Sequence, residues 1–250
     1  MITLRRDKQR RHLQRGTQDA WLTFDARDRA DPLADGFGNL EILNEDHMPA
    51  GAGAGVPLHR HHDAEIVTYV HEGALAYEDS AGRSGVIQTG EFQRMTAGRG
   101  IRHSESNASP TDWAHCFQMW LRPSEAGLAP SREQKRFSAA ERRGALCVIA
   151  SPDGQNGSMR LHQDALIYSS LLDSGQHVAH ELSRGRCVWV HVVRGEVTLD
   201  DVILTKGDGA GVTSDRAVSL TARSESEILL VDLSEPPPRP KRRPGHGLLT

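Results

Sequence analysis

TYVHEGALAYEDSAGRSGVIQTGEF, at residues 68–92, resembles VHVVRGEVTLDDVILTKGDGA, at residues 190–210. In each copy an apolar run ends at a glycine, Gly73 or Gly195, and a later turn carries a glycine followed by an acidic residue. Gly73 and Gly90 are 17 residues apart, whereas Gly195 and Gly207 are 12 apart, a difference that a longer hairpin turn at residues 79–82 can absorb. A duplicated unit of strand, turn and strand predicts two barrels of one kind.

The rest of the chain fits the same class of fold. Short apolar or alternating runs separated by Gly, Asp and Asn recur throughout, and long helical periodicity is scarce. Many short strands at this spacing are typical of a sandwich or barrel, so we expect an all-β protein. We place a first barrel at residues 1–125, a connection at 126–145, a second barrel at 146–235 and a disordered Pro-rich basic tail at 236–250. Helix is expected only in the connection, over residues 130–142.

The composition of the 250-residue chain suits two domains of ordinary size and argues against several classes of protein. No run approaches the roughly 18 apolar residues of a membrane span, and the basic start lacks the apolar stretch of a secretory signal, so we expect a cytoplasmic protein. A net charge of −3 gives no general attraction to nucleic acid. Cys116, Cys147 and Cys187 are widely spaced, which argues against disulfides and a thiolate zinc site. We expect a monomer.

Candidate metal ligands occur as two pairs, His59-x-His61 and His103-x-Glu105. Residues i and i+2 of a strand point to the same face about 6.6 Å apart, so both members of a pair can reach one ion. If the two strands lie side by side in a barrel, the pairs face each other across its lumen. They then supply three imidazole nitrogens and one carboxylate oxygen.

The second copy of the repeat serves as an internal comparison. The four candidate ligands lie at fixed offsets from Gly73 and Gly90. The same offsets, counted from Gly195 and Gly207 in the second copy, lead to Glu181, Ser183, Leu220 and Ala222. We therefore expect the second barrel to lack the metal site. His177 and His180 lie near the vacant position, but a three-residue spacing sends them to opposite faces of a strand. Other histidines have no partner at ligand spacing and are expected to be structural or exposed: His62, His71, His115 and His162.

These segments resemble known motifs. Gly53, five residues, His59-x-His61 and then Gly73 resemble the first cupin motif, and Gly90, Thr96-Ala97-Gly98, His103 and Asn107 resemble the second. More narrowly, HRHHDAEIVTYVHEG, EDSAG and GEFQRMTAGRGIRHSE resemble the pirin family, and the resemblance covers nearly the whole chain. It implies two cupin-type β-barrels in tandem, each a double-stranded β-helix of the jelly-roll kind.

The resemblance also bears on single residues. Arg60 stands where the family usually has proline, and because it alternates with the histidines we expect it to face outward. In pirin-like proteins the carboxylate ligand resembles Glu105. Glu65 then becomes either a supporting partner of the ligands or a plain strand residue.

Three imidazoles and one carboxylate suit one divalent transition metal ion, Fe(II) in the first place, with Mn, Ni, Cu or Zn as alternatives. The resemblance implies a dioxygenase that opens the flavonol quercetin with dioxygen and loss of carbon monoxide, in which Glu105, when displaced by the substrate, is the general base. The alternative is a non-catalytic metal- or redox-sensing protein that binds a transcriptional or metabolic partner. A third reading is a sugar or small-acid isomerase on the same scaffold.

Overall fold

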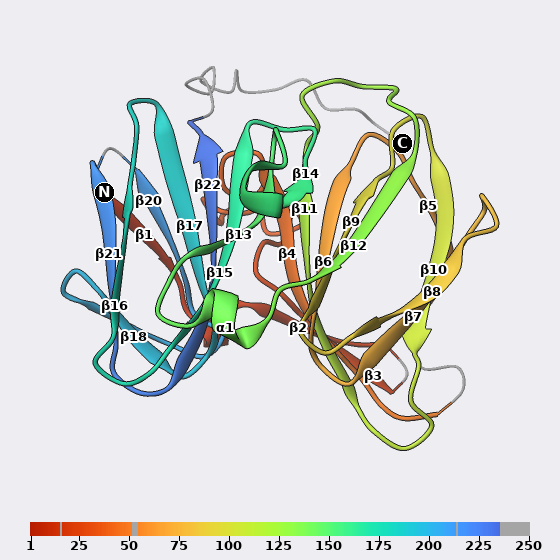
Figure 1. Ribbon diagram of the computed structural model, residues 1–250, viewed down its shortest axis with the longest axis horizontal. Helices are drawn as coiled ribbons and strands as arrows, with labels where there is room; N and C mark the ends of the chain where they lie inside the picture. The colour runs from red at the N-terminus through yellow and green to blue at the C-terminus, as the bar shows by residue number, and fades with distance from the viewer. Residues whose placement is uncertain (16, 52–54, 214, 236–250) are drawn as a thin grey trace.

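Two β-barrels stand side by side in the computed structural model of the protein (Figure 1). The structure describes residues 1–15, 17–51, 55–213 and 215–235. Each barrel consists of a seven-stranded and a four-stranded sheet, which confirms the expected all-β, two-barrel fold. The predicted tail at 236–250 lies outside the described residues.

The first barrel is built mainly from the N-terminal half of the chain. Its seven-stranded sheet has the order β12 (Ser131–Arg136), β9 (Glu91–Thr96), β6 (Glu65–Glu72), β11 (Ala114–Leu121), β4 (Leu40–Met48), β3 (Gln18–Leu22) and β2 (Arg11–Arg15). Its four-stranded sheet has the order β5 (Gly55–His61), β10 (Ile101–Asn107), β7 (Ala74–Asp79) and β8 (Ser84–Gln88).

The second barrel repeats this plan. Its seven-stranded sheet has the order β1 (Ile2–Arg5), β20 (Gly209–Thr213), β17 (Arg186–Arg194), β22 (Ser226–Ser234), β15 (Ala165–Leu172), β13 (Cys147–Ser151) and β14 (Met159–Arg160). Its four-stranded sheet has the order β16 (His177–Glu181), β21 (Ala217–Ala222), β18 (Glu196–Leu199) and β19 (Val202–Thr205). The N-terminal strand β1 thus belongs to the sheet of the second barrel.

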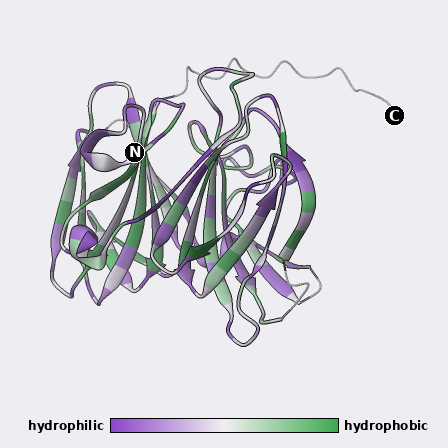
Figure 2. Ribbon diagram, turned by 45° about the vertical axis from the view of Figure 1, so that its right-hand side comes forward, coloured by the Kyte–Doolittle hydropathy of each residue, from purple (hydrophilic) through white to green (hydrophobic). Residues whose placement is uncertain are grey.

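The two large sheets are buried on both faces, because they enclose the lumens and also pack against each other. Along β11, Cys116 joins the apolar cluster of the first lumen, whereas Phe117 and Met119 join a cluster that includes Trp189 and Val231 of the second barrel. Alternate residues of a strand point to opposite faces, which explains this division. In Figure 2 hydrophobic segments lie along the strands of both barrels.

The repeat is visible in the backbone. Gly73 and Gly195 both have positive φ, +76° and +83°. A Cβ atom at either position would lie 2.3 Å from a backbone oxygen of a neighbouring segment. Only glycine combines this conformation with this close approach, so the same residue recurs where each barrel begins its hairpin. Both expected hairpins are present, as β7–β8 and β18–β19.

The expected helix is only partly found. Residues 139–142 form α1 (Ala139–Arg142), which Ser138 caps by accepting a hydrogen bond from the backbone of Glu141. The prediction of helix over residues 130–137 was wrong, because residues 131–136 form strand β12 and pair with β9. This segment has no apolar stripe to stabilise a helix, and pairing with the open edge of β9 satisfies its backbone instead.

The expectations about cysteines and membrane spans can also be compared with the structure. Cys116 and Cys187 are buried free thiols, and Cys147 is a partly buried one. Within the described ranges, no helix has the length and apolar character needed to cross a membrane.

Candidate metal centre

Three of the four predicted ligands meet inside the first barrel. Strands β5 and β10 pair antiparallel with His59 opposite His103, and His61 lies two residues further along on the same face. The ligand atoms of the three imidazoles all lie within 4.8 Å of one another. The Nε2 atoms of His59 and His61 are only 2.6 Å apart. The period of two and the direct cross-strand pairing together bring three rings to one point.

Glu105 lies beside this group. The pairing of β10 with β5 is irregular between His103 and Glu105, and Glu105 Oε1 lies 3.8 Å from His103 Nδ1. Its other oxygen, Oε2, accepts a hydrogen bond from the Gln118 side chain on β11. The carboxylate is therefore held at the edge of the histidine cluster with one oxygen directed toward it.

Burial sets the charge state of the histidines. Together with the neighbouring His59 ring, it lowers the pKa of His61 to about 4 and that of His103 to about 3. Neutral imidazole is the form that binds metal ions. His59 Nδ1 lies 2.8 Å from the carbonyl oxygen of Pro57, which leaves its Nε2 atom for the cluster.

The donor set fits a divalent transition metal ion. His103 is 3% exposed, yet neither of its ring nitrogens has a hydrogen-bond partner among the described residues. Unpaired buried ring nitrogens are costly, and a bound ion would satisfy them. Three imidazoles without a thiolate are compatible with several first-row metals.

Glu105 is tuned by its surroundings. Burial and the nearby carboxylate of Asp46 raise its pKa to about 7, against the lowering effect of the Gln118 hydrogen bond. The sequence alone did not single out Asp46, Gln118 or Trp120. Trp120 donates to Gln118 Oε1 at 3.2 Å and packs its ring against His61, with centroids 4.5 Å apart. The polar Gln118 between Cys116 and Trp120, on the lumen side of β11, was the signal in the sequence that could have revealed this contact with Glu105.

Arg60 and Glu65, two neighbours of the candidate ligands, can be compared with what the sequence led us to expect. Arg60 is exposed, as expected from its alternation with the histidines. Glu65 faces away from the lumen, because its Oε2 accepts a hydrogen bond from the backbone of His162 at 3.1 Å. Its proposed role as a supporting partner of the ligands is therefore wrong, and it joins the first barrel to the second.

The second barrel has an aliphatic lumen where the first has histidines. Strand β16 pairs with β21 so that Val178 lies opposite Leu220, the arrangement that places His59 opposite His103 in the first barrel. Val178, Leu220 and Ala222 are buried in one apolar cluster. His180 instead contacts Asp232 at 2.7 Å. In the part of the chain that the structure describes, the groups of candidate ligands lie outside this lumen.

Two hollows of the surface lie away from the histidine cluster. One, of about 360 Å³, is lined by Ser104 and Ser106, which alternate with His103 and Glu105 and so occupy the opposite face of β10. The other, of about 200 Å³, lies between the barrels. The cluster is reached from the side of His59, which is partly exposed next to the exposed Leu58.

Comparison with known proteins identifies the family. Residues 5–121 match the family model described as Pirin, and residues 148–233 match the one described as Quercetinase C-terminal cupin domain. A protein of Escherichia coli strain K12 named quercetin 2,3-dioxygenase is 41% identical over 233 residues, which cover 93% of this chain and 99% of that protein. The chain belongs to the pirin family.

Solved pirin structures agree with the fold. The crystal structure of YhhW from Escherichia coli has a TM-score of 0.88 and 40% identity, and the match covers 93% of this chain and 97% of that one. A structure of the bacterial pirin YhhW in complex with nickel(II) has a TM-score of 0.86 and 39% identity, covering 94% and 99%. A pirin with a metal ion and this fold has therefore been observed.

Proposed function

We propose that this pirin binds one divalent transition metal ion through His59, His61, His103 and Glu105 and opens the flavonol quercetin with dioxygen. The observation that carries the proposal is the convergence of three imidazoles within 4.8 Å, with both ring nitrogens of His103 unpaired. The relative from Escherichia coli named quercetin 2,3-dioxygenase supports the choice of substrate. We expect Fe(II) first; the metal, the cytoplasmic location and the monomeric state stay predictions.

Glu105, Gln118 and Trp120 have different roles in the proposed reaction. A redox-capable ion, when bound, would supply Lewis-acid and redox chemistry toward the 3-hydroxyl of the flavonol and toward dioxygen. Glu105 accepts the proton of that hydroxyl as the general base. Gln118 holds Glu105 Oε2, so that Oε1 stays on the side of His103. Trp120 packs beside His61 and gives the substrate an aromatic neighbour.

The test measures oxygen uptake and carbon monoxide release with quercetin on protein of known metal content. We expect turnover by the metal-loaded protein, loss of turnover after chelation, and restoration on adding the ion back. Glu105→Gln keeps the size of the side chain and removes the base, so turnover should fall by at least about 100-fold, within the usual range for general base catalysis. Ser104→Ala, on the opposite face of β10, is the matched control.

Protein that holds an ion in the first lumen and takes up no oxygen with quercetin would end the enzyme proposal. Redox-dependent affinity for a protein partner would then favour the sensor alternative. A chain whose metal content is unchanged in His59→Ala and His103→Ala would contradict the proposed ligands. These two results are separable, because metal content is measured independently of turnover.

A further inference from the structure

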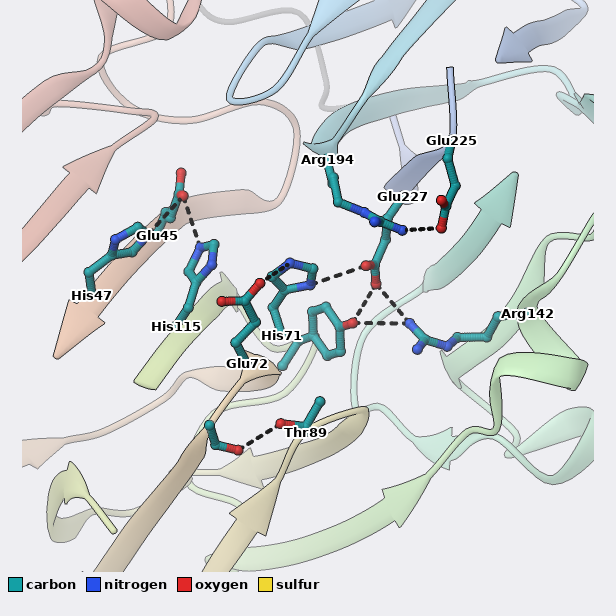
Figure 3. Close-up of polar contacts among 12 residues, drawn as sticks. Glu45, His47, His71, Glu72, Thr89, His115, Arg142, Arg194, Glu225 and Glu227 are labelled. Atoms are coloured by element: carbon teal, nitrogen blue, oxygen red, sulfur yellow. Dashed lines mark hydrogen bonds and ion pairs between the residues drawn. The ribbon is translucent and has the colours of Figure 1, made fainter. Parts of the chain in front are cut away.

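A second group of ligand-type side chains lies on the opposite face of the large sheet of the first barrel. Glu45 and His47 are two residues apart on β4, and His115 lies directly opposite His47 on the paired strand β11. Figure 3 shows the two rings turned toward the Glu45 carboxylate. The ligand atoms of the three residues all lie within 4.8 Å of one another. The strand geometry is therefore the same as in the lumen, with one imidazole replaced by a carboxylate.

The separations within this group suit a coordination sphere. Glu45 Oε1 lies 2.9 Å from His115 Nε2 and 3.2 Å from His47 Nε2. Ligands about 2.1 Å from an ion are about 3.0 Å apart at a right angle and about 3.4 Å apart at a tetrahedral angle. The three atoms could thus share an ion with small movements of their side chains.

The surroundings hold these side chains in place. Arg10 Nη2 lies 2.7 Å from Glu45 Oε2, so it orients the carboxylate and leaves Oε1 to the two histidines. Glu45 is 2% exposed and His115 is 6% exposed. A ligand carboxylate oriented by a second partner is the usual construction of a metal site in a protein.

A fourth side chain at this place lacks a partner. His191, on β17 of the second barrel, is fully buried, and neither of its ring nitrogens has a hydrogen-bond partner among the described residues. Its ring packs against Phe117, with centroids 5.7 Å apart, and the His115 ring packs against the same Phe117 at 4.9 Å, so His191 lies on the side of β11 that carries the group. An unpaired buried imidazole is costly, and nothing in the lumen site accounts for this one.

Open space adjoins the group as well. The hollow of about 200 Å³ between the barrels is lined by His47 and His115 from the first barrel and by Arg194 and Lys206 from the second. It offers room for water or an anionic ligand on the side of the histidines. The group therefore has an accessible face, which a purely structural hydrogen-bond network does not need.

We propose that Glu45, His47 and His115 form a second metal site, at the junction of the two barrels, for a divalent transition metal ion such as Zn²⁺. Two imidazoles and one carboxylate, with a further position open to the hollow, match the ligand types and number of open zinc sites. The site is independent of the lumen histidines and of the proposed activity. Its ion would sit on the face where the first barrel contacts the second.

The experiment measures Zn²⁺ bound per chain after chelation and equilibrium dialysis of the full-length protein. The wild type should bind two ions. His59→Ala/His61→Ala removes the lumen site and should leave one. Adding His47→Gln or His115→Gln to that variant should weaken Zn²⁺ binding at the remaining site by more than about 100-fold. Removal of a residue that only supports a ligand weakens metal binding by about 100-fold at most. Adding His180→Gln is the matched control, because His180 contacts a carboxylate without a second histidine.

Two results would overturn the proposal. One is a His59→Ala/His61→Ala protein that binds no Zn²⁺. The other is a remaining ion whose affinity is unchanged by His47→Gln, which would make Glu45, His47 and His115 a hydrogen-bond network only. His47 carries the decision if His115→Gln does not fold, because its side chain is 29% exposed. With Co²⁺ in place of Zn²⁺, the same His47→Gln change should alter the visible absorption of the ion.

Discussion

Replacement of Arg142 by methionine tests how the two barrels are joined. The Arg142 side chain is 7% exposed, and its Nη1 atom lies 2.8 Å from Glu227 Oε1 on β22. The same atom donates to the Tyr69 hydroxyl of the first barrel and to Ser169 Oγ, each at 3.1 Å. Tyr69 also donates to Glu227. Figure 3 shows Arg142 and His71 joined to the Glu227 carboxylate.

Methionine keeps the apolar bulk of Arg142 and removes its charge, leaving Glu227 buried without its cation. Removing one partner of a buried pair costs about 3–5 kcal/mol. We expect the lower end, about 3 kcal/mol, because His71 Nδ1 still lies 3.1 Å from Glu227 Oε2 and can share a proton with it. Adding Glu227→Gln to Arg142→Met should recover part of the loss, since no uncompensated charge then remains.

The assay is urea unfolding at pH 7, followed by tryptophan fluorescence and circular dichroism, which also reports whether the barrels unfold together. Arg143→Met is the matched control. Arg143 pairs with Asp173 at 2.6 Å, but both side chains are 50% exposed, so its loss should cost at most about 1 kcal/mol. Equal effects of the two substitutions, or an Arg142→Met loss below about 1 kcal/mol, would refute the reasoning.

Three further predictions concern single residues. Burial raises the pKa of Glu227, but its hydrogen bonds and ion pairs outweigh burial and lower the pKa below 4.5. The carboxylate therefore stabilises the fold above pH 4.5, and this stabilisation is lost as the pH falls below that value. Glu227→Gln should accordingly reduce the loss of stability at acidic pH, measured by thermal unfolding. Gln118→Leu removes the hydrogen bond to Glu105 and should weaken metal binding in the first lumen by about 10–100-fold, measured by competition with a chelator, whereas an unchanged affinity would exclude a supporting role. Gly73→Ala should destabilise the protein by more than Gly82→Ala, as measured by urea unfolding. Both glycines have positive φ, but a Cβ at Gly82 meets nothing within 4 Å, whereas one at Gly73 would meet a backbone oxygen. Equal losses of stability would show that the close backbone approach at Gly73 does not matter.

The lumen cluster could be predicted because it depends on short-range geometry. The spacing of His59 and His61 fixes a common face as soon as the segment is a strand, and the structure places His103 directly opposite His59. The same rule decides between the two interpretations of Glu65. Neighbouring residues of a strand point to opposite faces, so Glu65 points to the second barrel, whereas Ile66 joins an apolar cluster of the first barrel.

What depends on long-range pairing could not be predicted from the sequence. His115 was expected to be structural or exposed, because the sequence offers it no partner at ligand spacing; the pairing of β11 with β4 brings Glu45 and His47 to it from about 70 residues away. The Glu45-x-His47 spacing was present in the sequence as a signal. A single pair of this kind is common by chance, and only the neighbouring strand gives it a third member.

The pairing of β1 with β20 has a consequence for how the chain folds during synthesis. Residues 2–5 leave the ribosome long before residues 209–212, their partners in the second barrel. Ile2 and Leu4 pack against the apolar cluster of that barrel, so they have no final place to bury until almost the whole chain has been made. Closing the long loop between β1 and β20 is slow. Until it closes, β1 and the edge of β20 stay unpaired, and nascent chains can associate through either of them. Residues 146–235 alone would lack β1, so their expression should give aggregated protein.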